Sequence, residues 1–99
     1  MRLLARTRGF TRMRETLGHQ ILRYLLGHPG ARDSADGIRV WWLQPGCEAT
    51  VPEVEDALDD LVDRGWVETS GEGDVILFGL MPSASAEIRA YLTEKELRG

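Results

Sequence analysis

The segment TVPEVEDALDDLVDRGWVETSGEGDVILFGL, residues 50–80, decides how this 99-residue chain folds. Its first half predicts a helix, because Thr50 and Glu53 have the spacing of a capping box, in which each side chain accepts a hydrogen bond from the other residue's backbone N–H. Pro52 falls in the first turn, where its missing N–H costs nothing. One face of this helix is apolar, with Val54, Ala57, Leu58, Leu61 and Val62 at helical spacing. Gly65 is placed to end the helix in a left-handed cap.

The second half of the segment predicts two strands joined by a tight turn. Trp66, Val67 and Thr69 favour a strand, and VILFGL at residues 75–80 favours a returning strand. Between them, SGEGD at residues 70–74 supplies residues typical of turns. A helix followed directly by a hairpin is therefore the centre of the expected fold.

Two more helices are expected before this segment. Apolar residues at helical spacing predict a first helix that ends near Gly27, and they are Phe10, Met13, Leu17, Ile21, Tyr24, Leu25 and Leu26. The polar loop GARDSAD, residues 30–36, offers Asp33 or Ser34 as the cap of a short second helix through GIRVWWL, residues 37–43. Isoleucine, valine and tryptophan also favour strands, so these residues alone leave both structures open.

A last helix is expected after Met81 and Pro82, capped by Ser83 or Ser85. Its apolar stripe comprises Ala84, Ile88, Tyr91 and Leu92. The core predicted from all of these elements contains Leu17, Ile21, Leu25, Leu58, Leu61, Trp66 and Phe78.

The order of these elements resembles a winged helix-turn-helix domain, with DALDDLVDRGWVE as the third helix running into the first wing strand and SGEGD as the wing tip. The resemblance covers residues 11–80 and favours a helix over a strand at residues 37–43. It implies an α+β fold with a three-helix core, a two-stranded β-hairpin wing and a C-terminal helix. The chain then divides into an arginine-rich arm at residues 1–10, a winged-helix domain at residues 11–81 and a C-terminal helix at residues 82–99.

The adjacent Trp41 and Trp42 cannot both face one core from a helix, because neighbouring residues point about 100° apart. We expect one of them to fill the core and the other to be partly exposed as a contact for a partner. Burial of both under neighbouring elements remains an equally open alternative.

The composition predicts a soluble protein, and the motifs predict no catalytic activity. The share of charged residues, 28%, is that of a globular chain, and no apolar run approaches the roughly 20 residues of a membrane span. The single cysteine, Cys47, fits a reducing compartment and hence a cytoplasmic location. Neither His19 nor His28 has a ligand-like neighbour pattern, and no phosphate-cradling glycine motif or Ser/His/Asp set is present. We therefore expect no enzyme, no cofactor and no metal site.

Charge is divided unevenly along the chain. An acid-free basic arm holds five arginines, Arg2, Arg6, Arg8, Arg12 and Arg14, whereas the other residues carry all sixteen acids and seven basic side chains. The outward face of the predicted third helix holds Glu53, Glu55, Asp56, Asp59, Asp60 and Asp63. Winged-helix domains commonly bind DNA by laying this helix in the major groove. Acids on that face oppose such docking, because base readout uses Arg, Lys, Asn or Gln and phosphates repel carboxylates.

Two functions from different classes follow. The first is a non-catalytic winged-helix module for protein–protein interaction or assembly, with a partner-binding face at Glu53, Asp56, Asp59, Asp60 and Asp63 and possible apolar contacts at Trp41, Trp42 and Tyr91. Its basic partner is the arm of the same chain, the arm of a second copy in a homodimer, or another protein. The alternative is a DNA-binding transcriptional regulator that contacts DNA through the arm, the wing or dimer symmetry. Any binding through the arm should then be weak, salt-sensitive and independent of sequence.

Overall fold

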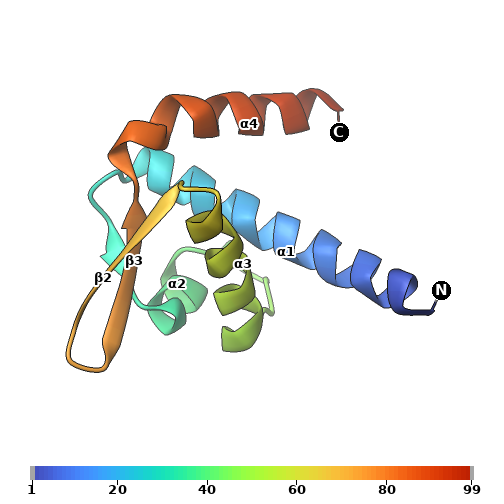
Figure 1. The fold of residues 1–99 in the computed structure, drawn as a ribbon, viewed down its shortest axis with the longest axis horizontal. Helices are drawn as coiled ribbons and strands as arrows, with labels where there is room; N and C mark the ends of the chain where they lie inside the picture. Colours follow the sequence, from blue (N-terminus) through green and yellow to red (C-terminus); the bar gives the residue numbers. More distant parts are fainter. Residues whose placement is uncertain (1, 99) are drawn as a thin grey trace.

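The computed structural model describes the backbone of residues 2–98 and the side chains of residues 14–71 and 73–97. Its elements are α1 (Arg2–Gly27), β1 (Arg32–Asp33), α2 (Ala35–Trp41), α3 (Val51–Asp63), β2 (Val67–Glu72), β3 (Val75–Leu80), the 3-10 turn η1 (Pro82–Ala84) and α4 (Ser85–Arg98). The described chain is thus α+β, with four α-helices and one antiparallel sheet in the order β1-β3-β2. In Figure 1, α1 runs between α4 on one side and α2 and α3 on the other, and the β2–β3 hairpin projects from one end.

The third helix begins and ends where the sequence predicts. Thr50 Oγ1 accepts a hydrogen bond from the Glu53 backbone N–H at 3.3 Å, and Glu53 Oε1 accepts one from the Thr50 N–H at 2.8 Å, which completes the capping box. At the other end, Gly65 has a φ of 81°, a conformation that is unstrained only for glycine. The Trp66 N–H then bonds back to the carbonyl of Leu61 at 3.0 Å, so the chain leaves the helix directly into β2.

The sheet has three strands, and the prediction of a two-stranded sheet is therefore wrong. The segment predicted as a polar loop contains β1, in which Arg32 lies opposite Gly79 of β3. A Cβ at Gly79 would lie only 2.9 Å from Arg32 Cγ, so the missing side chain leaves room for the arginine to cross the strand. Arg32 Nη2 then reaches Glu68 of β2 at 2.7 Å. A two-residue strand cannot show an alternating pattern, and for that reason the sequence alone did not reveal it.

The hairpin turn is also tighter than predicted. Ser70 and Gly71 belong to the predicted turn, but in the structure they pair with Leu77 and Ile76 of β3. Only two residues, Gly73 and Asp74, connect the strands, and Gly73 has the positive φ of 65° that a two-residue hairpin turn requires at one or both positions.

The core contains six of the seven residues that were predicted for it. Leu17, Ile21, Leu25, Leu58, Leu61 and Trp66 are buried, whereas Phe78 is only partly buried at the edge of the cluster. Phe78 lies opposite Thr69, farther along the projecting hairpin than the buried pair of Val67 and Leu80. The side chains of Phe10 and Met13, also expected to face inward, lie outside the described residues.

The second element is a helix, α2, capped by Ser34, whose Oγ accepts a hydrogen bond from the Gly37 N–H at 3.1 Å. The side chains of the two tryptophans point to different sides of this element. Trp42 is 7% exposed and stacks on Tyr24 with 4.6 Å between ring centroids, whereas Trp41 is 74% exposed. The prediction that one tryptophan is inside and the other outside is confirmed.

Candidate functional site

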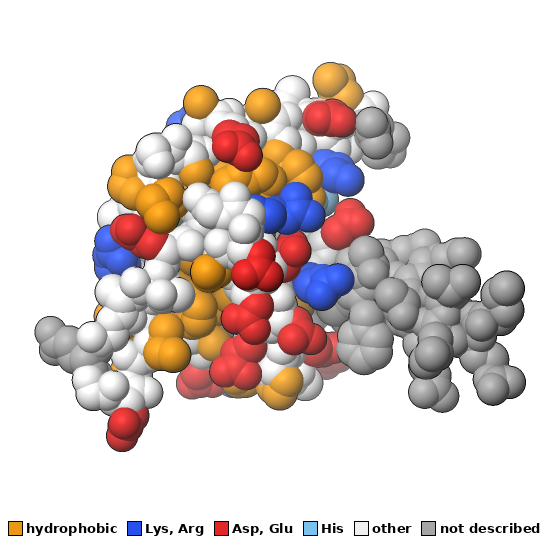
Figure 2. Space-filling model, viewed as in Figure 1, with side chains coloured by type: hydrophobic (Ala, Val, Ile, Leu, Met, Phe, Trp, Pro, Cys, Tyr) orange, Lys and Arg blue, Asp and Glu red, His pale blue; other side chains and the backbone are white. Residues whose placement is uncertain are grey.

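The acidic side chains of α3 form one exposed surface, which we call the acidic α3 face. It consists of Glu53, Glu55, Asp56, Asp59, Asp60 and Asp63. Figure 2 shows acidic side chains in a column over α3, with apolar side chains between that column and the hairpin. The buried side of the same helix holds Val54, Leu58 and Leu61, so packing fixes the direction in which the acids point.

Two members of the acidic α3 face already have partners within the chain. Glu53 is held by the capping box, and Asp60 accepts a hydrogen bond from Arg64 Nε at 3.0 Å. The other four, Glu55, Asp56, Asp59 and Asp63, are exposed and form no hydrogen bond or ion pair with any described residue. The carboxylates available to a partner are therefore these four.

The basic arm is the least described of the predicted sites. Its backbone belongs to α1, which begins at Arg2 and continues without a break to Gly27. The side chains of Arg2, Arg6, Arg8 and Arg12 lie outside the described residues, and only that of Arg14 is described, as exposed. The backbone of the arm is therefore helical from Arg2 onward.

The predicted apolar contacts separate into inner and outer residues. Trp42 is buried, and Tyr91 is half-buried against Trp66 with 4.8 Å between ring centroids. Trp41 and its neighbour Val40, which is 49% exposed, remain on the surface of α2. Trp41 is thus the predicted contact residue whose ring is free to meet a partner.

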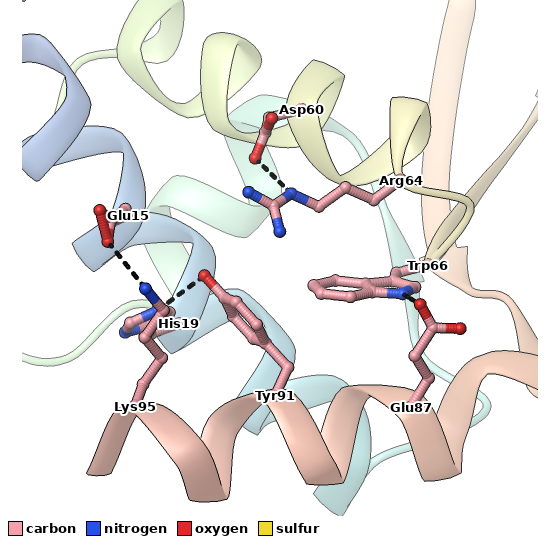
Figure 3. A network of polar contacts seen from close by, with 8 residues as sticks. All are labelled: Glu15, His19, Asp60, Arg64, Trp66, Glu87, Tyr91 and Lys95. Atoms are coloured by element: carbon pink, nitrogen blue, oxygen red, sulfur yellow. Dashed lines mark hydrogen bonds and ion pairs between the residues drawn. The ribbon is translucent and has the colours of Figure 1, made fainter. Parts of the chain in front are cut away.

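A cleft of about 210 Å³ lies between α1, α3 and α4 and was not anticipated from the sequence; we call it the three-helix cleft. Its lining is Arg14, Glu15, Gly18, His19, Leu22, Asp60, Leu61, Arg64, Tyr91 and Lys95. Figure 3 shows polar side chains from all three helices pointing toward one another around it. Three i,i+4 pairs supply most of them: Glu15 and His19, Asp60 and Arg64, and Tyr91 and Lys95. The sequence shows the spacing of each pair, but it does not show that the three pairs lie around one cleft.

Aromatic rings hold the cations of the three-helix cleft in place. The guanidinium carbon of Arg64 lies 5.2 Å from the centre of the Trp66 ring and 5.3 Å from that of Tyr91. Lys95 Nζ lies 5.6 Å from the Tyr91 ring centre. Cations within about 6 Å of a ring are attracted to its face, so both side chains are partly ordered before any ligand arrives. Trp66 is itself fixed by a hydrogen bond from its Nε1–H to Glu87 at 2.9 Å.

His19 of α1 also lines the three-helix cleft, where it contacts Tyr91. Its Nε2 lies 3.3 Å from the Tyr91 hydroxyl, a hydrogen bond whose direction depends on the tautomer. Burial lowers the pKa of His19 below its ordinary value of 6.5, and the nearby cations Arg23, Lys95 and Arg64 act in the same direction, while Glu15 opposes them. At neutral pH the ring is therefore largely uncharged.

We expect the chain to lose stability as the pH falls below 6.5, the unfolded value for His19. Because the folded state binds this proton more weakly than the unfolded state, the free energy of unfolding is highest above that value and falls as the pH drops toward the lowered folded pKa. Replacing His19→Gln should remove this part of the pH dependence, measured by urea unfolding at intervals between about pH 7.5 and 5.5. His28→Gln is the control, since His28 is exposed directly after the end of α1. Equal effects of the two substitutions would contradict the assignment.

Comparisons with protein-family models, with curated proteins and with solved structures find no match to this chain. None of the described helices has the length and apolar character that crossing a membrane requires. Within residues 14–71 and 73–97, no three side chains of His, Cys, Asp or Glu are grouped in a way that could hold a metal ion.

Proposed function

We propose that this chain is a non-catalytic winged-helix module that acts in protein–protein interaction or assembly. The winged-helix assignment is supported by the order of three helices followed by a hairpin, which β1 extends by one short strand without altering. The interaction role rests on one observation, namely that Glu55, Asp56, Asp59 and Asp63 are exposed on a rigid helix and have no partner among the described residues.

The partner that best complements this surface is the arginine arm of a second copy. The arm supplies five arginines and no acid. Arg14 lines the three-helix cleft together with Asp60, but the earlier arginines lie farther from the acidic α3 face of their own chain while α1 remains a continuous helix. Gly18 is the position where α1 lies against Leu61 of α3, and at 1.5 Å per residue Arg2 and Arg8 lie about 24 Å and 15 Å farther along the axis. Contact between arm and face is therefore expected between copies.

Charge alone would make such a contact weak. Exposed ion pairs contribute about 0–1 kcal/mol each and are screened by salt. Apolar area is needed for a stable complex, and Trp41, which is 74% exposed, can supply it. The proposal therefore involves both electrostatic and apolar contacts.

DNA binding is less well supported by the described surface. Arg23, Arg32, Arg39, Arg64 and Lys95 are each within 4 Å of a carboxylate. Among the described side chains, only Arg14 and Arg89 are cations without an ion pair. A broad basic patch, which a DNA-binding surface needs, is thus not seen in residues 14–71 and 73–97.

A charge-swap experiment tests the proposal. The double variants Asp59→Lys with Asp63→Lys, and Arg6→Glu with Arg8→Glu, should each be monomeric by light scattering at low salt. When the two variants are mixed they should associate, because the introduced glutamates in the arm of one variant then meet the introduced lysines on the α3 face of the other, and the unchanged arm and face also remain opposite in charge. The matched control is Glu48→Lys with Asp74→Lys, which makes the same charge change at exposed positions outside the acidic α3 face and should leave association intact.

Three outcomes would count against the proposal. If the native chain is monomeric at every salt concentration, the second-copy form fails. If the control variant loses association as fully as the α3 variant, the effect is one of net charge and not of the acidic α3 face. If the chain binds duplex DNA tightly, and the binding persists in the α3 variant but not in the arm variant, the DNA-binding regulator is the better account.

A further inference from the structure

The three-helix cleft gathers more hydrogen-bond donors than its own acids use. Arg64 gives its Nε–H to Asp60, and its two Nη groups have no hydrogen bond to any described residue. Lys95 Nζ lies 3.8 Å from Glu15, which is beyond hydrogen-bond distance. Tyr91 also lines the cleft, and Figure 3 shows the end of the Arg64 side chain extending toward the Tyr91 hydroxyl. Arg64 and Lys95 therefore both have hydrogen-bond donors that no described carboxylate uses, and both line the three-helix cleft.

The charges of the lining leave room for one anion. Arg14, Arg64 and Lys95 are cations, whereas Glu15 and Asp60 are carboxylates, so the lining carries one excess positive charge when His19 is neutral. Arg14 has no ion pair with any described residue. The excess charge therefore comes from Arg14, which lies at the exposed edge of the lining.

The walls of the cleft limit the size of what it can hold. Gly18, Leu22 and Leu61 form its apolar part, and Leu61 Cδ2 would lie 3.8 Å from a Cβ at Gly18. A volume of about 210 Å³ is below the roughly 300–1,000 Å³ of pockets for drug-sized ligands. The cleft therefore suits a small ligand.

We propose that the three-helix cleft is a binding site for the carboxylate or phosphate group of a small ligand, held by Arg64, Lys95 and the Tyr91 hydroxyl. The guanidinium and ammonium groups give charge-assisted hydrogen bonds to the oxyanion, and Tyr91 adds a neutral one. The aromatic contacts of Arg64 and Lys95 reduce the ordering cost on binding. This site shares Asp60 with the acidic α3 face but uses none of its four carboxylates without a described partner, Glu55, Asp56, Asp59 and Asp63.

The test is a titration of the full chain with inorganic phosphate and, separately, with acetate, followed by NMR at constant ionic strength maintained with sodium chloride. Saturable shifts are expected at the Arg64 side chain and the His19 ring. Lys95→Gln should weaken binding about tenfold, because it removes a hydrogen bond to a charged group. Tyr91→Phe, which keeps the ring beneath the cations, should weaken it by a smaller factor. Arg89→Gln is the matched control, since it removes one charge from an exposed position of the same helix and should leave the affinity unchanged.

The pKa of His19 supplies a second measurement, because it should change on anion binding but not if the cleft residues only join the three helices. A bound anion stabilises the imidazolium, so phosphate or acetate should raise the pKa of His19, against the effect of the surrounding cations. The charged or titratable groups around His19 are Glu15 and Arg23 on α1, Asp60 on α3, Arg64 at the C-cap of α3, and Tyr91 and Lys95 on α4.

The outcomes separate cleanly. Binding of phosphate but not acetate assigns the site to phosphate groups, and the reverse assigns it to carboxylates. Shifts no larger than those from chloride, or equal affinities for the Lys95→Gln and Arg89→Gln variants, would overturn the proposal. Loss of self-association in the charge-swap experiment bears on the acidic α3 face alone and leaves this site unaffected.

Discussion

Replacing Leu58 by alanine is expected to lower the free energy of unfolding by about 2–5 kcal/mol, as truncation of a packed leucine does. Leu58 has no exposed surface and lies on the buried side of α3, between Val54 and Leu61. The substitution removes apolar contacts and leaves a cavity that the surrounding side chains can fill only in part. Small domains are stable by only about 5–15 kcal/mol, so the midpoint of urea unfolding should fall clearly.

The chain contains a matched control for this substitution. Leu97, on the last turn of α4, is 84% exposed, so Leu97→Ala deletes the same atoms from the surface. Its effect should stay within about 0.5 kcal/mol. A loss below about 1 kcal/mol for Leu58→Ala would mean that α3 turns another face to the core, and the outward direction of the acidic α3 face would then be lost as well.

The central helix and hairpin could be predicted from the sequence because their signals are local. The capping box of Thr50 and Glu53 lies within four residues, and the left-handed Gly65 lies next to the last turn that it ends. Such signals depend on backbone geometry that the neighbouring residues determine by themselves. The direction of the acidic α3 face followed from the same helix, because its apolar stripe determines which side is buried.

The third strand depends on residues that are distant in the sequence. Arg32 pairs with Gly79 and reaches Glu68, and neither partner has a local signal that points to Arg32. A two-residue strand forms only where a neighbouring strand supplies its hydrogen-bond partners. Arg32 and Asp33 therefore become a strand only when the β2–β3 hairpin has formed and β3 can pair with them.

The three-helix cleft escaped prediction for a related reason. Each i,i+4 pair that lines it lies on one face of its own helix, which spacing alone indicates. The sequence does not specify the packing of α4 on α1, which brings Lys95 within 3.8 Å of Glu15. The same limit left open which of Trp41 and Trp42 is buried, since a helix can be rotated by one residue without losing its apolar character.

Replacing Trp66 by alanine is expected to lower the free energy of unfolding by about 3–5 kcal/mol. Trp66 is 5% exposed and links the start of β2 to α4 through the Tyr91 ring and the hydrogen bond to Glu87. Its loss should therefore loosen α4 more than α3. Amide hydrogen exchange should show the largest loss of protection in α4, whereas Ile88 and Leu92, which remain buried, keep the helix attached.

Trp41→Ala is the matched control, because it makes the same change at a side chain that is 74% exposed. It should alter stability by no more than about 0.5 kcal/mol and leave exchange in α4 unchanged. Trp66→Phe should lie between the two, since the phenyl ring retains most of the apolar contact but cannot donate to Glu87, a bond worth about 0.5–3 kcal/mol. If Trp41→Ala proved as destabilising as Trp66→Ala, Trp41 would belong to the core, and the apolar contact proposed for the partner would have to lie elsewhere.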